Sequence, residues 1–210
     1  MPANAPTPRA RARRAVGSFG LMDRERHPHD AYETPDEAVA MLLRFESFAD
    51  GIWDSSAGRG RLVKALAANL RPRPYICATD LHNYTVDHDF VRATDHSRSG
   101  VDFLATTAME PHTRHIVINP PYRESEHHVR HALSLLPDRG AKLAVLLRLT
   151  WIAAKRRADL LAHLRKIIIC GRCKMLPPDV PDEGHGGTVD FAWMIFGPHE
   201  VSEGVKIIRA

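Results

Sequence analysis

No run of apolar residues approaches the ~20 that a membrane-spanning helix needs, and the N-terminus lacks the apolar core of a secretory signal. Cysteine is scarce, because Cys77, Cys170 and Cys173 are too few for a disulfide framework. Of the 210 residues, 44% are apolar and 26% are charged, which is typical of an ordinary globular protein. We therefore expect a soluble cytoplasmic protein without membrane contact.

Acidic residues are absent from the first 22 positions, which hold Arg9, Arg11, Arg13 and Arg14. The chain has 29 Lys and Arg against 25 Asp and Glu, so the remainder carries equal numbers of the two charges. We predict a disordered Arg-rich tail at 1–22, followed by a single domain at 23–210. The four arginines are candidate contacts to nucleic-acid phosphates, with a solvated tail or an organelle transit peptide as alternatives.

Apolar segments that favour strands alternate with segments of helical periodicity from residue 34 onward. Thr34 and Pro35 are typical of an N-cap and a first helical position. The expected strands cover 51–54, 75–80, 101–104, 115–118, 142–147, 167–169 and 191–196, and the expected helices cover 35–45, 61–70, 125–136 and 153–164. This alternation predicts an α/β fold with a doubly wound, Rossmann-like, seven-stranded and mostly parallel sheet, whose ligands sit at the carboxyl ends of the strands.

Glycines and acidic residues follow the first three expected strands, namely Asp54, Gly58, Gly60, Asp80 and Asp102. Glycine lets a backbone approach a ligand closely, and a carboxylate after the next strand can accept hydrogen bonds from ribose hydroxyls. The sequence has no Gly-x-x-x-x-Gly-Lys-Ser/Thr motif and no third glycine after Gly60, which disfavours nucleotides held by their phosphates. S-adenosylmethionine is the common phosphate-free alternative. A tight turn with helix-capping acids is the structural alternative.

The segment Asn119-Pro120-Pro121-Tyr122 directly follows an apolar strand. Its two prolines fix φ and remove two backbone donors, so that neighbouring carbonyls have fewer internal partners. The Asn119 amide oxygen and the Pro120 carbonyl could accept both protons of a planar amino group, while the Tyr122 ring stacks on the attached heterocycle. A β-turn with an aromatic core residue is the alternative interpretation.

Together these features resemble the amino-group methyltransferases that act on adenine N6 and share the class I methyltransferase fold. The resemblance runs from Tyr32 to Phe196, and its segments 146–149, 155–157 and 188–193 are similar to the small enzymes of phages and prophages. Ser55 stands where a proline is usual in that family. The resemblance implies the catalytic residues Asn119, Pro120, Pro121 and Tyr122, and the S-adenosylmethionine-binding residues Tyr32, Thr34, Pro35, Asp54, Ser56, Ala57, Gly58, Gly60, Asp80, Asp102, Phe103 and Asn119.

The implied reaction is direct in-line transfer of a methyl group to N6 of adenine in DNA, after the base is flipped from the duplex. Lys155, Arg156 and Arg157 would contact DNA phosphates or form a solvated helix face. Because the core fills most of the chain, three alternatives remain for site selection: the loop at 171–187 and the Arg-rich tail read a short site, the enzyme has relaxed specificity, or a protein partner guides it. Alternatives are an RNA adenine, a protein glutamine amide, or a catalytically decayed nucleic-acid-binding module.

No metal site is expected. Cys170 and Cys173 form one Cys-x-x-Cys pair, and with the distant His185 they fall short of the four ligands of a structural zinc site. The expected helix 125–136 carries His127, His128 and His131, which we interpret as exposed histidines near the substrate entrance.

Overall fold

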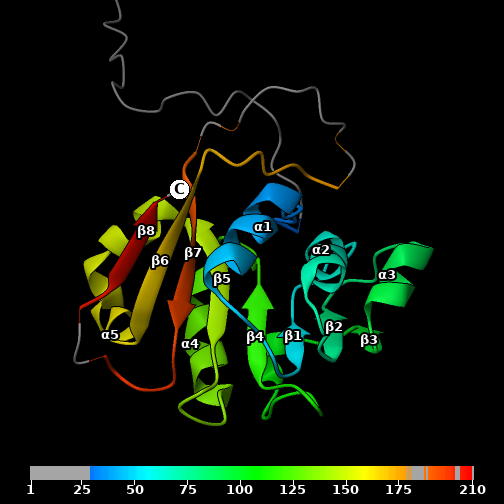
Figure 1. Cartoon of the computed structure of the whole chain (residues 1–210), viewed down its shortest axis with the longest axis horizontal. Helices are drawn as coiled ribbons and strands as arrows, with labels where there is room; N and C mark the ends of the chain where they lie inside the picture. Colours follow the sequence, from blue (N-terminus) through cyan, green and yellow to red (C-terminus); the bar gives the residue numbers. More distant parts are fainter. Residues whose placement is uncertain (1–28, 179, 181–186, 188, 202–203, 210) are drawn as a thin grey trace, which may run out of the picture.

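The computed structural model describes residues 29–178, 180, 187, 189–201 and 204–209, so residues 1–22 with Arg9, Arg11, Arg13 and Arg14 lie outside it. Within the described residues, one sheet has the strand order β3-β2-β1-β4-β5-β7-β6-β8 (Figure 1). The strands are β1 (Ile52–Asp54), β2 (Ile76–Asp80), β3 (His96–Ser99), β4 (His115–Ile118), β5 (Leu143–Arg148), β6 (Leu164–Gly171), β7 (Phe191–Phe196) and β8 (Lys206–Arg209). The α-helices are α1 (Asp36–Phe45), α2 (Arg61–Asn69), α3 (His88–Ala93), α4 (Ser125–Leu135) and α5 (Ala158–Leu161), and the 3-10 helices are η1 (Phe103–Ala105), η2 (Leu149–Ala153) and η3 (Lys155–Arg157).

The expected α/β class and the mostly parallel sheet are confirmed. Strand β1 lies between β2 and β4 and is parallel to both, which places the reversal of strand order at β1 and β4. Strand β5 continues the parallel set, whereas β7 runs antiparallel to β5 and to β6. The carboxyl ends of β1, β2, β4 and β5 therefore share one edge of the sheet.

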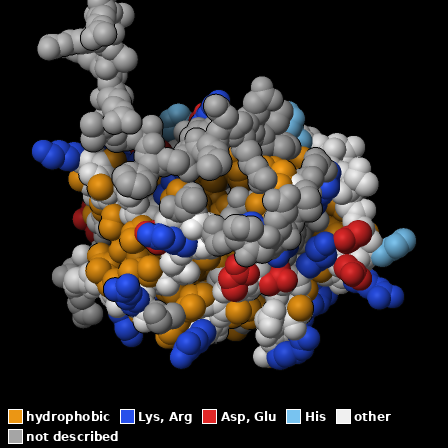
Figure 2. Space-filling model, turned by 90° about the horizontal axis from the view of Figure 1, so that it is seen from above, with side chains coloured by type: hydrophobic (Ala, Val, Ile, Leu, Met, Phe, Trp, Pro, Cys, Tyr) orange, Lys and Arg blue, Asp and Glu red, His pale blue; other side chains and the backbone are white. Residues whose placement is uncertain are grey.

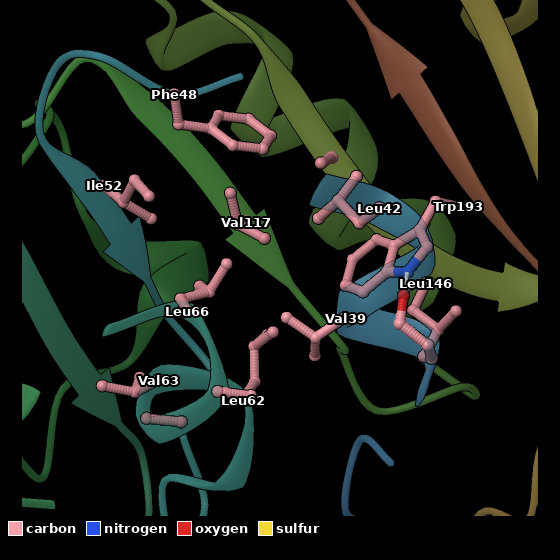
Figure 3. Packing of buried hydrophobic residues seen from close by; sticks show 14 of the residues in the cluster. Val39, Leu42, Phe48, Ile52, Leu62, Val63, Leu66, Val117, Leu146 and Trp193 are labelled. Atoms are coloured by element: carbon pink, nitrogen blue, oxygen red, sulfur yellow. Dashed lines mark hydrogen bonds between the residues drawn. The ribbon is translucent and has the colours of Figure 1, made fainter. Parts of the chain in front are cut away.

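Helices cover both faces of the sheet because its central strands alternate two sets of apolar side chains. On one face, α1 and α2 pack on Ile52, Val117 and Trp193, as Figure 3 shows. The buried Trp193 indole donates a hydrogen bond from Nε1 to the Ala38 carbonyl oxygen at 2.7 Å. On the opposite face, α4 and α5 pack on neighbouring strand positions, among them Ile116.

One expected strand is wrong, and two strands at the sheet edges were not expected. The sheet has eight strands instead of seven, because β8 pairs in parallel with β6. The expected strand at 101–104 is instead an extended turn into η1, where the Asp102 carboxylate accepts a hydrogen bond from the Leu104 backbone N–H at 3.0 Å. The edge strand before it is β3, whose four residues are all exposed and therefore lack the apolar alternation that marks a half-buried strand.

Three helical expectations also need correction. Helix α1 begins one residue later than expected, with Pro35 at the N-cap and no side-chain cap from Thr34. The basic segment expected as one helix at 153–164 is divided into part of η2, then η3 and the four-residue α5. Helix α3 was not expected; the Asp87 side chain caps it by accepting a hydrogen bond from the Phe90 N–H. Within the described part of the chain, no helix has both the length and the apolar character needed to span a membrane.

Candidate active site

A cavity of about 450 Å³ opens at the carboxyl edge of the sheet, beside the reversal of strand order. Of the predicted cofactor residues, it is lined by Tyr32, Thr34, Ser56, Ala57, Gly58, Asp80, Asp102, Phe103 and Asn119. Three others do not line it: Pro35 and Gly60 are the N-caps of α1 and α2, and Asp54 is the buried last residue of β1. The sequence thus brings most of the predicted residues together around one space, called here the first cavity.

The glycine turn between β1 and α2 uses both glycines in left-handed backbone conformations. Gly58 has φ +55°, and a Cβ placed there would meet no atom within 4 Å. Gly60 has φ +83°, and a Cβ there would lie 2.0 Å from Cδ2 of Phe90. Gly58 therefore keeps the cavity wall open for a close ligand, whereas Gly60 lets α2 pack against α3.

The acidic residues that follow β1 and β2 support this turn. The Asp80 carboxylate accepts hydrogen bonds from the backbone N–H groups of Gly58 and His82, both at 2.8 Å, and it also lines the first cavity. Asp54 is fully buried; its Oδ1 accepts from the Ser56 N–H at 3.1 Å, while its Oδ2 has no partner among the described residues. Burial raises the pKa of Asp54 from 3.8 to about 8, against the lowering effect of the Ser56 hydrogen bond.

Phe103 forms an apolar part of the first cavity, directly after Asp102. Its ring packs edge-on against Trp53 at 5.2 Å between centroids and stacks with His128 at 5.5 Å. His128 also lines the cavity and is buried, which corrects the expectation of an exposed histidine. Its place on the inward face of α4 with Val129 and Ala132 could have been inferred from helical spacing.

Asn119 is held at the end of β4 with its amide in a defined orientation. Its Nδ2 donates a hydrogen bond of 2.7 Å to the Tyr32 carbonyl oxygen, an atom that can only accept. The amide must therefore place Oδ1 on its other side, where Oδ1 is buried and has no hydrogen-bond partner among the described residues. A buried acceptor without a donor costs about 1–3 kcal/mol, so this oxygen is suited to a donor on a ligand.

Tyr122 lies on the other side of the tetrapeptide and does not line the first cavity. Its ring stacks with Tyr32 at 5.7 Å, and the Arg148 guanidinium lies over it at 5.4 Å from the centroid. Burial raises the pKa of Tyr122 above its ordinary value near 10. Tyr122 lines a second, neighbouring cavity of about 290 Å³, which sequence reasoning did not anticipate.

The basic residues proposed as phosphate contacts differ in their surroundings. Arg156 and Arg157 both donate from Nε to Glu126 at 2.8 and 2.9 Å, and their side chains are 71% and 13% exposed. Arg157 also donates to the Trp151 carbonyl oxygen at 2.6 Å, so it is tied to the protein interior. Figure 2 views the molecule from the side toward which β4 points, and Lys and Arg are spread over it with Asp and Glu among them.

Among the described residues, no group of three or more His, Cys, Asp or Glu is arranged to hold a metal ion. The Cys173 thiol donates to the Cys170 carbonyl oxygen at 3.5 Å, and His185 lies outside the described residues.

Several solved methyltransferases share this fold. A modification subunit of a proposed type I restriction enzyme from Vibrio vulnificus matches with a TM-score of 0.58 at 12% identity, over 85% of this chain and 47% of that chain. A proposed RNA methyltransferase from Pyrococcus horikoshii matches with a TM-score of 0.54 at 12% identity, over 82% and 89% of the two chains. Geranyl diphosphate C-methyltransferase from Streptomyces coelicolor, solved with S-adenosyl-L-homocysteine, matches with a TM-score of 0.50 at 13% identity, over 76% and 77%.

These similarities establish the class I methyltransferase fold of the chain, which spans about half the length of the Vibrio vulnificus subunit. No protein-family model matches the sequence, and no curated protein matches it.

Proposed function

We propose that the chain is an S-adenosylmethionine-dependent methyltransferase that transfers a methyl group to the N6 amino group of adenine in DNA. The observation that carries this proposal is the Asn119 amide, which has a fixed donor side and a buried, unpartnered Oδ1 at the end of β4. The resemblance of the tetrapeptide to adenine-N6 enzymes supplies the substrate.

The residues of the first cavity fit S-adenosylmethionine. A volume of about 450 Å³ is in the range of small-molecule sites, roughly 300–1,000 Å³. The space at Gly58, which a Cβ would fill, admits a ligand against the backbone. Each Asp80 oxygen accepts one backbone hydrogen bond and keeps further acceptor capacity for ribose hydroxyls. Phe103 offers an apolar contact for the adenine ring of the cofactor.

Asn119 and Pro120 would activate the acceptor nitrogen. An exocyclic amino group donates its lone pair into the ring and is therefore a poor nucleophile. Hydrogen bonds accepted by Asn119 Oδ1 and by the Pro120 carbonyl would return electron density to that nitrogen. None of the described residues donates a hydrogen bond to the Pro120 carbonyl oxygen, so this second acceptor is also unpartnered.

Bound S-adenosylmethionine supplies an electrophilic methyl group on a sulfonium. The protein's part is to hold the amino nitrogen in line with that group, and alignment of this kind contributes about 7–11 kcal/mol to lowering a barrier. Tyr122 is proposed to stack on the flipped base. In the free protein the Tyr32 ring stacks on Tyr122, so Tyr32 must either move away or cover only part of the Tyr122 ring when the base binds. Stacking on an aromatic side chain contributes roughly 1–3 kcal/mol per base.

Methyl-labelled S-adenosylmethionine and adenine-containing DNA test the proposal directly. The Asn119→Ala variant should lose roughly 100-fold or more of the transfer rate, the usual effect of removing one transition-state hydrogen-bond partner, while it still binds the cofactor. Asn69→Ala is the matched control, because Asn69 Nδ2 also donates to a backbone carbonyl, that of Ala65, but away from the cavity. Equal transfer by the Asn119→Ala variant and the wild type would refute the role of Asn119.

The Tyr122 ring is tested by two substitutions. Tyr122→Ala should reduce transfer, and Tyr122→Phe should restore much of it, because stacking needs the ring and not the hydroxyl. The same loss in both variants would contradict a stacking role.

The substrate class is tested separately. Mass spectrometry of DNA nucleosides, RNA nucleosides and peptides from cells that overproduce the protein should show added N6-methyladenine in DNA. Methylated adenine in RNA or methylated glutamine in protein would instead identify the acceptor as one of the alternatives. Absence of all three products would favour the decayed module, and copurifying proteins would reveal a guiding partner.

A further inference from the structure

The second cavity lies beside the first along the carboxyl edge of the sheet. It is formed by residues that follow β4 and by residues at and after the end of β5, including Tyr122, Arg123, Arg148, Thr150 and Arg157. Arg123 lines both cavities, so the two spaces adjoin at the tetrapeptide. A molecule whose amino group reaches Asn119 would therefore have its remaining parts near this second cavity.

The lining of the second cavity is positively charged. Three of its residues are arginines, and none is an aspartate or a glutamate. Arg157 is already paired with Glu126 at 2.9 Å, which leaves the side chains of Arg123 and Arg148; the nearby Asp30 carboxylate accepts a hydrogen bond from the backbone N–H of Arg123 and not from its guanidinium. Neither of these two forms an ion pair with a described carboxylate. A concave site with two such guanidinium groups favours an anion.

Arg148 is poised to bind that anion. Its guanidinium lies over the Tyr122 ring, a contact that uses the flat face of the group and leaves the in-plane N–H donors available. Its Nε is buried and has no hydrogen-bond partner among the described residues. The in-plane fork of a guanidinium matches two oxygens of a phosphate, and Thr150, an exposed residue that lines the same cavity, carries a hydroxyl that can donate as well.

We propose that the second cavity is a phosphate subsite of the acceptor, with Arg148 as its principal ligand and Arg123 as its second. The inference rests on the proposed transfer to an amino group at Asn119, and it assigns an acceptor that carries a phosphate group. It therefore favours a nucleotide or polynucleotide over a protein glutamine, which carries no phosphate. Tyr122 joins the two functions, because one ring contacts Arg148 and is proposed to stack on the base.

A charge-deletion cycle tests the subsite by binding alone. Fluorescence anisotropy would measure binding of a short labelled DNA with one adenine, made with phosphodiester or with uncharged methylphosphonate links beside that adenine. The wild type should bind the phosphodiester DNA about tenfold more tightly. Arg148→Gln should bind the phosphodiester DNA several-fold more weakly than the wild type and should lose most of the preference for it, with Arg123 keeping the remainder. The salt dependence of its DNA affinity should decrease by the equivalent of about one phosphate contact.

The control is Arg139→Gln, which removes the same charge from an exposed residue between α4 and β5, outside both cavities. It should bind both DNAs as the wild type does. Arg148→Lys keeps the charge without the planar fork and should recover part of the discrimination. Thermal unfolding of each variant would confirm that the variants compared are folded. An Arg148→Gln variant that still prefers the phosphodiester DNA as strongly as the wild type would overturn the proposal.

Further arms identify the phosphate source and separate the two proposals. Competition by deoxyadenosine, by deoxyadenosine monophosphate and by the oligonucleotide would distinguish a mononucleotide from a polynucleotide phosphate. If the protein methylates DNA but Arg148 does not affect its preference for phosphodiester over methylphosphonate DNA, the phosphate subsite is refuted and the proposed function is retained. An Arg148-dependent preference for the charged DNA without methyl transfer to any adenine would support the subsite and refute the proposed function.

Discussion

Substitution of Gly58 by alanine tests whether the backbone at Gly58 contacts the cofactor, and substitution of Gly100 shows how much stability such a change costs on its own. Gly58 and Gly100 have φ values of +55° and +73°, and in both places an added Cβ meets no atom within 4 Å. A left-handed backbone costs a non-glycine residue roughly 1–2 kcal/mol, and the reduced freedom of the unfolded chain offsets roughly 0.4–1 kcal/mol of this. Both variants should therefore lose about 1 kcal/mol of unfolding free energy.

Only the Gly58→Ala variant should affect the first cavity, because Gly58 lines it and Gly100 does not. Isothermal titration with S-adenosylmethionine should show at least about tenfold weaker binding for Gly58→Ala, equivalent to about 1.4 kcal/mol, and wild-type binding for Gly100→Ala. Gly60→Ala is the opposite case, since its Cβ would lie 2.0 Å from the buried Phe90 ring. That clash should add roughly 1–3 kcal/mol of destabilisation.

Urea unfolding measures the stability of the three glycine variants, and isothermal titration measures their affinity for S-adenosylmethionine. If Gly58→Ala and Gly100→Ala bind S-adenosylmethionine equally well, the backbone at Gly58 is not a contact surface for the cofactor. If Gly60→Ala is no less stable than Gly100→Ala, the packing of α2 against α3 does not require that glycine.

Two further predictions concern the interior. Because the folded state holds the pKa of Asp54 near 8, folding takes up a proton between about pH 4 and pH 8, and the unfolding free energy of the wild type falls as pH rises through that range. The Asp54→Asn variant should therefore become more stable than the wild type by roughly 1 kcal/mol per pH unit in that range, with no difference of this origin below pH 4. Thermal unfolding at several pH values would measure the difference, and a difference independent of pH would contradict this assignment. Trp193→Phe removes the hydrogen bond to the buried Ala38 carbonyl oxygen, and it should lower the unfolding free energy by about 1–3 kcal/mol without changing S-adenosylmethionine binding. An unchanged urea midpoint would show that this hydrogen bond does not contribute to the stability of the fold.

The central strands could be predicted from sequence because burial on both faces leaves a continuous apolar signal. Strand β5, Leu143–Arg148, is buried at five of its six positions, and its expected position was right within one residue. The edge strands gave no such signal. Strand β3 is exposed throughout, and β8 is exposed apart from one position, so neither carries the burial pattern that sequence reasoning detects.

The basic segment after β5 failed as a helix for a tertiary reason. Its residues have acceptable helical propensity, but Arg157 is held by Glu126 of α4 and by the Trp151 carbonyl oxygen. Its guanidinium also lies 4.4 Å from the centroid of the Trp151 ring. The contact with Glu126 joins positions 31 apart and the contacts with Trp151 join positions six apart, and the segment forms short 3-10 helices and α5 in place of a single long helix.

The first cavity was predictable as a location because parallel strands bring their carboxyl ends to one edge whatever the details of packing. The second cavity was not, because it depends on Arg148 lying over Tyr122, 26 positions earlier in the chain. No local pattern encodes that contact. The orientation of the Asn119 amide also depends on a distant group, the Tyr32 carbonyl oxygen.

Buried polar atoms without hydrogen-bond partners are concentrated at the edge of the sheet that holds the two cavities. Among the described residues they include Asp54 Oδ2, Ser55 Oγ, Asn119 Oδ1, Tyr122 Oη and Arg148 Nε, and every one of these belongs to the end of β1, β4 or β5 or to the turn that follows. Each such atom destabilises the fold by about 1–3 kcal/mol, a cost that folding alone would not concentrate at one edge of a sheet. Ligands that supply partners to those of these atoms whose residues line a cavity, such as Asn119 and Arg148, would recover that free energy on binding, so the atoms that weaken the free protein would favour its complexes.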